Sequence, residues 1–123
     1  VFLKYFTSSI EIGIVIDGGI AMKILLVCSA GMSTSLLVER MLASAKERHL
    51  NVDIEARPIA DTVIYGKDAD AIMLGPQVRF QEDHIRSLFD KTKPIAVIDM
   101  KDYGMMNGKK VLQDALDLIE SKK

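Results

Sequence analysis

After residue 21, short apolar segments alternate with longer amphipathic ones, and this alternation limits the possible folds more than any other feature of the chain. A short, continuous apolar run is typical of a strand buried on both faces, whereas apolar residues at intervals of three and four positions indicate a helix. Their alternation predicts an α/β domain with an open four-stranded parallel sheet and helices on both faces. The expected strands cover 23–28, 51–59, 69–75 and 93–99, and the expected helices cover 34–50, 59–68, 77–92 and 108–123.

Apolar positions within these segments predict which residues fill the core. The first strand is apolar almost throughout, whereas the second alternates and meets Pro58, so we expect the second strand at an edge of the sheet. Each longer helix should turn one apolar stripe inward. The residues expected on these stripes are Leu37, Met41 and Ala45; Val78, Ile85, Leu88 and Phe89; and Val111, Leu112, Ala115, Leu116 and Ile119.

Length, charge and cysteine content exclude several classes of protein. The 123 residues suffice for one domain, and the net charge of −1 provides no general attraction to nucleic acid or to an anionic membrane. A single cysteine cannot form a disulfide within the chain or a cysteine-rich metal site, and His49 and His84 are expected on the surface. No apolar stretch reaches the roughly 20 residues that span a bilayer. We therefore expect a cytoplasmic protein that uses neither a metal ion nor an organic cofactor.

Residues 1–21 lack the alternating pattern. Acidic residues interrupt their apolar character, which argues against a signal peptide. Gly18 and Gly19 lie just upstream of Met22, where a bacterial ribosome-binding sequence would read as glycine codons if the start were assigned too early. We expect the functional protein to begin at Met22, with one domain over 22–123 and no stable fold for 1–21. A strand that extends the domain is the alternative.

The first strand leads directly into the only cysteine of the chain, in the segment LLVCSAGMSTSLL (25–37). Small and hydroxyl residues follow Cys28, and a helix is expected to begin near Thr34. Ligands of open parallel sheets bind beyond the carboxyl ends of the strands. Backbone N–H groups and the positive end of the helix could form an anion site there, and the same field would favour the reactive thiolate of Cys28. The expected phosphate-binding residues are Ser29, Ala30, Gly31, Met32, Ser33, Thr34 and Ser35.

Two interpretations of this segment compete. Cys28 is either a small apolar packing residue or a nucleophile held over an anion site. Likewise, one of Ser33, Thr34 and Ser35 is either a phosphate ligand or simply the helix cap. The position of Cys28 at a strand end, before glycine and hydroxyl residues, favours the nucleophile.

Similar cysteine loops occur in tyrosine phosphatases, where an arginine clamps the phosphate in the transition state. Thr34 takes the position of that arginine, and the segment 29–35 holds no basic residue. Asp99 and Asp102 lie on a plausible loop, but neither stands out as a general acid. A site without the clamp should hold phosphate on sulfur and hydrolyse it slowly, which predicts a phosphoryl carrier. A small cysteine phosphatase and a non-covalent flavodoxin-like regulatory module are the alternatives.

Three motifs in order along the chain carry a family resemblance: MKILLVCSAGMSTSLLVERM from residue 22, LGPQVRF after the third strand, and YGMMNGKKVL before the last helix. With them, residues 22–123 resemble the enzyme IIB component of the bacterial phosphoenolpyruvate-dependent sugar phosphotransferase system, in the lactose, cellobiose and diacetylchitobiose class. The resemblance implies a flavodoxin-like fold similar to that of low-molecular-weight tyrosine phosphatases.

The resemblance also implies a function. A IIA protein would pass a phosphoryl group from a phosphohistidine to Cys28, and the phosphocysteine would donate it to a sugar, expected to be a β-linked disaccharide, bound by the membrane-embedded IIC protein. The chain would then work at the inner face of the membrane through IIC, without inserting into it and without binding nucleic acid. The residues expected to contact partners are Pro76, Gln77, Phe80 and Tyr103, and Met32 is expected to join Phe80 in a docking patch near the sulfur.

Overall fold

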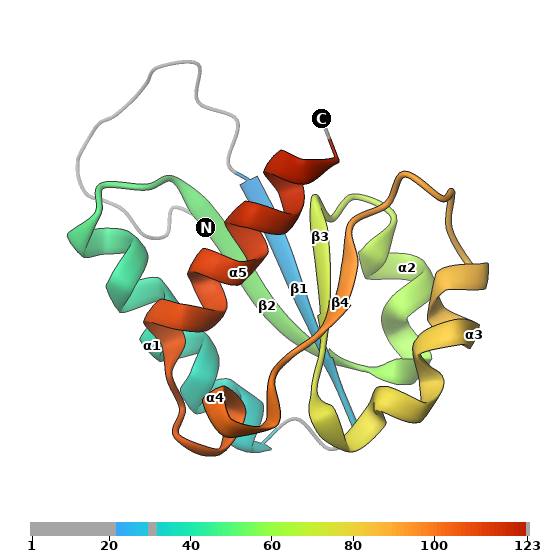
Figure 1. Ribbon diagram of the computed structural model, residues 1–123, viewed down its shortest axis with the longest axis horizontal. Helices are drawn as coiled ribbons and strands as arrows, with labels where there is room; N and C mark the ends of the chain where they lie inside the picture. The colour runs from blue at the N-terminus through green and yellow to red at the C-terminus, as the bar shows by residue number, and fades with distance from the viewer. Residues whose placement is uncertain (1–21, 30–31, 123) are drawn as a thin grey trace.

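The computed structural model describes residues 22–29 and 32–122, which form one α/β layered domain. Its sheet has four parallel strands in the order β2-β1-β3-β4, as the alternation predicts (Figure 1). The strands are β1 (Met22–Cys28), β2 (Val52–Pro58), β3 (Ala71–Leu74) and β4 (Ile95–Val97). β2 lies at an edge, as its alternating pattern and Pro58 predict. The prediction for residues 1–21 lies outside the described residues.

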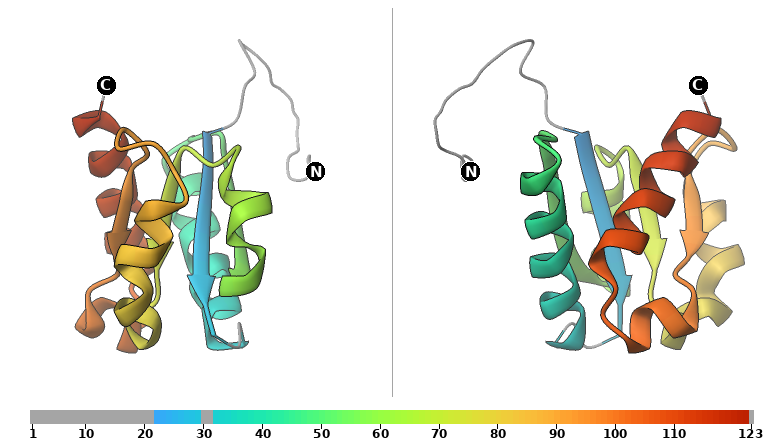
Figure 2. Two further views of the ribbon diagram at one scale, coloured as in Figure 1. Left: turned by 90° about the vertical axis from the view of Figure 1, so that its right-hand side faces the viewer. Right: turned by 60° about the vertical axis from the view of Figure 1, so that its left-hand side comes forward.

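Helices cover both faces of the sheet (Figure 2). One face packs against α1 (Met32–Glu47) and α5 (Gly108–Ser121), and the other against η2 (Pro76–Gln81) and α3 (Glu82–Ser87). The chain leaves β2 through η1 (Ile59–Asp61) and α2 (Thr62–Gly66), and α4 (Met100–Gly104) follows β4. None of the described helices is long and apolar enough to cross a membrane.

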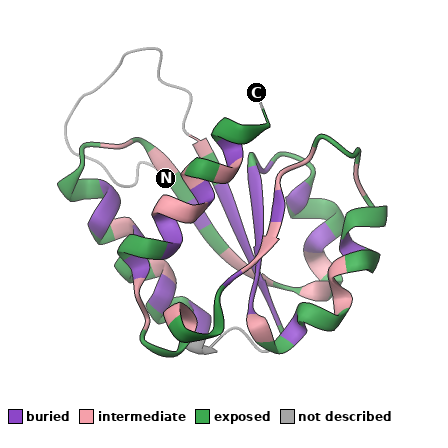
Figure 3. Cartoon of the chain, in the orientation of Figure 1, coloured by how far each residue is buried: buried purple, intermediate pink, exposed green. Residues whose placement is uncertain are grey.

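The core has two parts, one on each side of the sheet. In β1, Ile24 and Leu26 belong to the part under α1 and α5, whereas Leu25 and Val27 belong to the opposite part. Alternate side chains of a strand point to opposite faces, so a strand covered on both faces must be apolar throughout. This explains the unbroken apolar run of β1, which Figure 3 shows as buried along the centre of the domain.

The predicted single helix over 77–92 is wrong. Pro76 opens a 3-10 turn, and the backbone leaves helical geometry at Val78 (φ −116°, ψ 19°) before α3 begins. Val78 and Ile85 are buried as predicted, but Leu88 lies beyond the end of α3 and is 36% exposed. Apolar spacing therefore predicted the burial of Val78 and Ile85 correctly, although they belong to two short elements, and was wrong for Leu88.

Two helices end with a residue in the left-handed conformation. His49 (φ 56°) follows α1, and Met106 (φ 52°) follows α4. At His49, the amides of His49 and Leu50 donate to the carbonyls of Lys46 (3.1 Å) and Ala45 (2.9 Å). This pair of hydrogen bonds is a Schellman motif, and the same pair closes α4. His49 and His84 are both exposed, as predicted.

Candidate active site

The carboxyl ends of the four parallel strands meet at one edge of the sheet, the lower edge in Figure 1. Cys28 is the last residue of β1, while η1, η2 and α4 follow β2, β3 and β4. The amino end of α1 returns to the same edge. The fold therefore brings the segments predicted to bind phosphate and partners to one end of the domain.

Cys28 is fully buried, with 0% of its surface exposed. It lies beside Pro58 of β2, and its Sγ is 3.9 Å from the carbonyl oxygen of Arg57, to which the thiol can donate a weak hydrogen bond. Ser29 is exposed, whereas Ala30 and Gly31 lie outside the described residues. The sulfur thus lies at the strand end, as predicted, and it is covered by the surrounding chain.

The helix after Cys28 begins at Met32, two residues before the predicted start. Ser33, Thr34 and Ser35 are therefore inside its first turn, so the suggestion that one of them precedes and caps the helix is wrong. Thr34 is buried with 1% exposed, and Ser35 is exposed. The backbone N–H groups at the start of a helix have no partner within the helix and attract anions. The amino end of α1 thus presents these groups at the edge where β1 ends.

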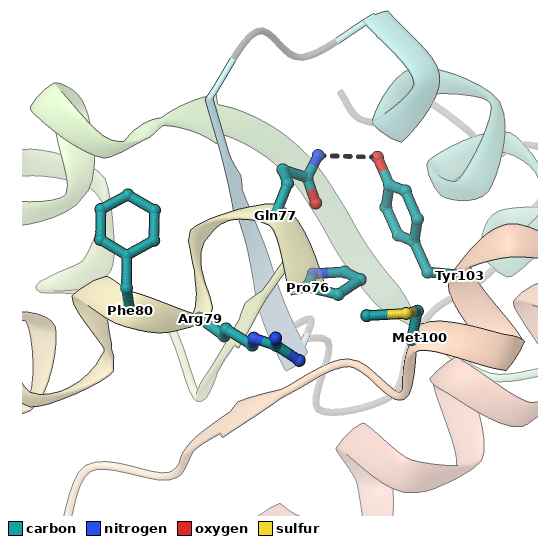
Figure 4. A pocket seen from close by; sticks show the side chains of 6 residues that line it. All are labelled: Pro76, Gln77, Arg79, Phe80, Met100 and Tyr103. Atoms are coloured by element: carbon teal, nitrogen blue, oxygen red, sulfur yellow. Dashed lines mark hydrogen bonds between the residues drawn. The ribbon is translucent and has the colours of Figure 1, made fainter.

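Tyr103 joins two of the other segments at this edge. Its hydroxyl lies 3.1 Å from Oγ1 of Thr34 in α1, and Nε2 of Gln77 in η2 donates a hydrogen bond of 3.0 Å to the same hydroxyl. Figure 4 shows the side chains of Gln77 and Tyr103 pointing toward each other from η2 and α4. Chain segments that follow β1, β3 and β4 are thus linked through one phenol oxygen.

Asp99 and Asp102, the two acidic residues considered as general acids, have structural contacts. The carboxylate of Asp99 caps α4 by accepting hydrogen bonds from the amides of Lys101 (3.0 Å) and Asp102 (3.2 Å). The carboxylate of Asp102 lies 3.9 Å from Nζ of Lys110. The hydrogen bond that Lys110 donates to Asp114 raises the pKa of Lys110, and the negative charges of Asp114, Asp102 and Asp99 add to this effect. These contacts stabilise the short helix that carries Tyr103.

A hollow of about 650 Å³ opens beside Tyr103. All four residues predicted to contact partners line it, so the structure brings them together (Figure 4). Phe80 is 75% exposed at one end of the hollow. Arg79 and Met100 also line it and were missed, although Arg79 lies between two predicted residues in sequence. The lining residues are Pro76, Gln77, Arg79, Phe80, Met100 and Tyr103.

Metal-binding geometry is absent from the part of the chain that the structure describes. Over 22–29 and 32–122, no group of three or more histidine, cysteine, aspartate or glutamate side chains is placed to hold an ion.

Comparison with known protein families shows the family of this chain. Residues 23–114 match the family model described as the lactose/cellobiose-specific IIB subunit of the PTS, the phosphotransferase system. The chain belongs to this family. It is accordingly a phosphotransferase component for sugar phosphorylation, as the sequence resemblance predicts, and this disfavours both the phosphatase and the non-covalent regulatory module.

Named relatives match most of the chain and nearly all of their own length. The galactose-specific EIIB component of Lactococcus lactis subsp. cremoris (strain MG1363) is 41% identical over 102 residues, covering 78% of this chain and 94% of that protein. The cellobiose-specific EIIB component of Lactococcus lactis subsp. lactis (strain IL1403) is 40% identical with the same coverage. The oligo-beta-mannoside-specific EIIB component of Bacillus subtilis (strain 168) is 40% identical over 98 residues, covering 79% and 95%.

Solved structures confirm the fold. The solution structure of the cellobiose-specific IIB component from Borrelia burgdorferi is 41% identical, with a TM-score of 0.74 and coverage of 86% of this chain and 98% of that chain. The lactose-specific IIB domain from Streptococcus pneumoniae is 19% identical, with a TM-score of 0.71 and coverage of 79% and 96%, and it shows the shared fold alone. The predicted flavodoxin-like sheet is thus the fold of IIB domains.

Proposed function

We propose that this IIB component carries a phosphoryl group on Cys28. The thiolate attacks the phosphohistidine of a IIA protein, so that an S–P bond forms while the N–P bond breaks and the imidazole keeps the electron pair. The phosphocysteine then donates the group to a hydroxyl of a sugar bound by the membrane IIC protein. In this second step the S–P bond breaks, sulfur takes its electrons, and the sugar hydroxyl loses its proton.

The observation that carries this proposal is the place of Cys28 between the end of β1 and the amino end of α1. We assign the phosphate-binding role to the backbone and hydroxyl groups of the segment after it. This segment contains no arginine or lysine, so peptide dipoles would have to stabilise the phosphate charge without a basic side chain. The proposed phosphate-binding residues are Ser29, Ala30, Gly31, Met32, Ser33, Thr34 and Ser35.

Burial of the sulfur sets a requirement for transfer. Cys28 has no exposed surface, so a phosphohistidine on another protein reaches Sγ only if the groups that cover it move. In-line phosphoryl transfer needs the attacking and leaving atoms on opposite sides of phosphorus. We therefore expect transfer to be fast only inside a complex that exposes Sγ and aligns it with the donor.

The hollow beside Tyr103 is the surface that we assign to partner docking. Its exposed apolar residues include Phe80 (75% exposed) and Met100 (58% exposed), and Arg79 adds a positive charge at the same place. Pro76, Gln77, Phe80 and Tyr103 are the proposed contacts with IIA or IIC. Exposed aromatic and arginine side chains often dominate the binding energy of protein interfaces.

The names of the relatives suggest the class of sugar that is phosphorylated. The relatives carry the names galactose, cellobiose and oligo-beta-mannoside. We propose β-linked saccharides as the substrate class, with the sugar held by IIC and the chain working at the inner face of the membrane through that partner.

Labelling with radioactive phosphate tests the proposal. The wild-type chain, incubated with a IIA protein charged from phosphoenolpyruvate, should become labelled on Cys28, and label should pass to one sugar of a galactoside, cellobiose and β-mannoside panel when IIC membranes are added. Cys28→Ser should keep its circular dichroism spectrum, remain unlabelled at position 28 and support no sugar phosphorylation.

Label on any other residue would refute the assignment of Cys28. Rapid turnover of p-nitrophenyl phosphate by the wild-type chain would instead favour a phosphatase.

A further inference from the structure

The hydroxyl of Tyr103 has hydrogen-bonding partners in two other segments, Gln77 in η2 and Thr34 in α1. The side-chain NH₂ of Gln77 can only donate, so the phenol oxygen of Tyr103 accepts from it at 3.0 Å. The phenol hydrogen can then be donated to Oγ1 of Thr34, which lies 3.1 Å away. An oxygen of Thr34 that accepts from Tyr103 has its own hydrogen left to donate elsewhere.

Thr34 occupies a position where such a donor matters. It is 1% exposed and lies in the first turn of α1, the helix whose amino end reaches the edge that holds Cys28. When Tyr103 is the donor in its contact with Thr34, the hydrogen of the Thr34 hydroxyl is left for an anion.

We propose that Tyr103 is a positioning residue that, held by Gln77, orients Thr34 so that its hydroxyl donates to the phosphoryl group on Cys28. This inference rests on the proposed phosphocysteine and goes beyond it. It also changes the role of two predicted partner contacts, because Gln77 and Tyr103 act within the chain rather than only on its surface.

The segments on either side hold this arrangement in place. Tyr103 is carried by α4, which the carboxylate of Asp99 caps at one end and the left-handed residue Met106 closes at the other. On the other side, the amide of Gln77 folds over Gly75. A Cβ atom built on Gly75 would overlap Oε1 of Gln77. Alanine can adopt the backbone angles of Gly75 (φ −61°, ψ 147°) without strain. Gly75→Ala should therefore displace the side chain of Gln77 and leave Tyr103 itself unchanged.

The test measures the single-turnover rate of phosphoryl transfer from a charged IIA protein that labels the wild-type chain. Tyr103→Phe removes one hydroxyl and should lower the rate at saturating donor about tenfold, less than the 10²–10³-fold cost of losing a direct transition-state donor. The loss should appear in the saturated rate, because the half-maximal donor concentration also reports on docking, in which Tyr103 is a proposed contact. Gly75→Ala should lower the saturated rate severalfold, because Gln77 is displaced.

Coupling between the two hydroxyl groups provides a readout that a purely structural role would not give. Thr34→Val should lose at least as much rate as Tyr103→Phe, and the double variant should be no slower than Thr34→Val alone. Thr34→Ser, which restores a hydroxyl, should regain most of the rate lost in Thr34→Val.

Two controls separate positioning from loss of stability. Tyr65→Phe removes the hydroxyl of an exposed tyrosine on α2, and Ile119→Val weakens the core near the carboxyl end of α5. Both should transfer at the wild-type rate. The inference is overturned if Tyr103→Phe transfers at the wild-type rate, or if only its half-saturating donor concentration changes. It is also overturned if the double variant loses the product of the two single losses. A third contradicting result is an Ile119→Val chain that is as stable as Tyr103→Phe and is slowed by the same factor.

A wild-type chain that is never labelled at Cys28 overturns the proposed function and this inference together. Labelling of the wild-type chain with an unaffected Tyr103→Phe overturns the inference alone.

Discussion

His49 ends α1 in a backbone conformation that is costly for any residue with a side chain. Its φ of 56° is left-handed, which costs an L-residue about 1–2 kcal/mol, whereas glycine adopts it freely. Glycine at position 49 relieves this strain, but its extra freedom in the unfolded chain offsets part of the gain. His49→Gly should therefore raise the free energy of unfolding by about 0.5 kcal/mol, measured by urea denaturation.

His84→Gly is the matched control for this prediction. His84 is also exposed, but it lies inside α3 with helical geometry, so glycine there should lower the free energy of unfolding by roughly 0.3–0.5 kcal/mol. Equal losses at the two positions would contradict the account of His49.

Single residues show where sequence analysis succeeds and where it stops. Cys28 could be placed at a strand end because an apolar run precedes it and small residues follow. The contact between Thr34 and Tyr103 joins residues 69 positions apart, and no local pattern announces it. Strand-end positions predicted that the loops with Gln77 and Tyr103 approach the site, and the family resemblance added the prediction that both contact partners.

The α1–α5 pair depends on a glycine at the start of α5. A Cβ atom on Gly108 would lie 2.5 Å from the carbonyl carbon of Arg40 and 2.6 Å from the amide nitrogen of Met41. These are backbone atoms of α1 and cannot move aside independently. Gly108→Ala should therefore force the two helices apart and lower the free energy of unfolding by about 1–3 kcal/mol in urea denaturation.

Gly104→Ala is the control for the packing prediction. A Cβ atom on Gly104 meets nothing within 4 Å, and alanine favours the helix, so this variant should be as stable as wild type or up to about 1 kcal/mol more stable. A stable Gly108→Ala protein would show that α1 and α5 tolerate a wider separation.

Elements were predicted well where long apolar patterns exist and poorly where short turns decide. The helices α1 and α5 and the strands follow from periodicity, because each must bury a continuous stripe or run. The break between η2 and α3 depends on backbone angles at Val78, which periodicity does not report. Helix α4 has five residues and was not predicted, because it is held by the cap of Asp99 rather than by an apolar stripe.

At the scale of the whole domain, the parallel direction of the strands places all four carboxyl ends at one edge of the sheet. The alternation of strands and helices alone predicts this edge as the place where a ligand binds. The family assignment adds that the domain takes part in sugar phosphorylation. The shape of the hollow could not be predicted, because it is formed by side chains from two separate segments, η2 and α4. Phe80 was predicted to belong to this surface, whereas Arg79 and Met100, which line the same hollow, were missed.

If Cys28 is the phosphoryl carrier, as proposed, one sulfur at one edge implies that IIA and IIC dock on overlapping surfaces. In the proposed relay, a IIA phosphohistidine and a IIC-bound sugar would each have to reach Sγ of Cys28, so we expect Phe80 to contribute to both complexes. Phe80→Ala should raise the half-saturating concentration of IIA in the labelling reaction and of the labelled chain in sugar phosphorylation, each by roughly 5- to 30-fold, as expected for an interface aromatic. Stability should change little, because Phe80 is 75% exposed.

Leu88→Ala is the matched control, since Leu88 is a partly exposed apolar residue just beyond the far end of α3. It should leave both half-saturating concentrations unchanged.

If Phe80→Ala affects only one of the two reactions, then IIA and IIC approach the sulfur over different parts of the edge. In that case both partners could bind the chain at once, and a IIA variant without its phosphorylatable histidine would fail to inhibit sugar phosphorylation. Overlapping docking predicts the opposite, competitive inhibition that excess IIC relieves, because neither partner can reach Sγ while the other covers it.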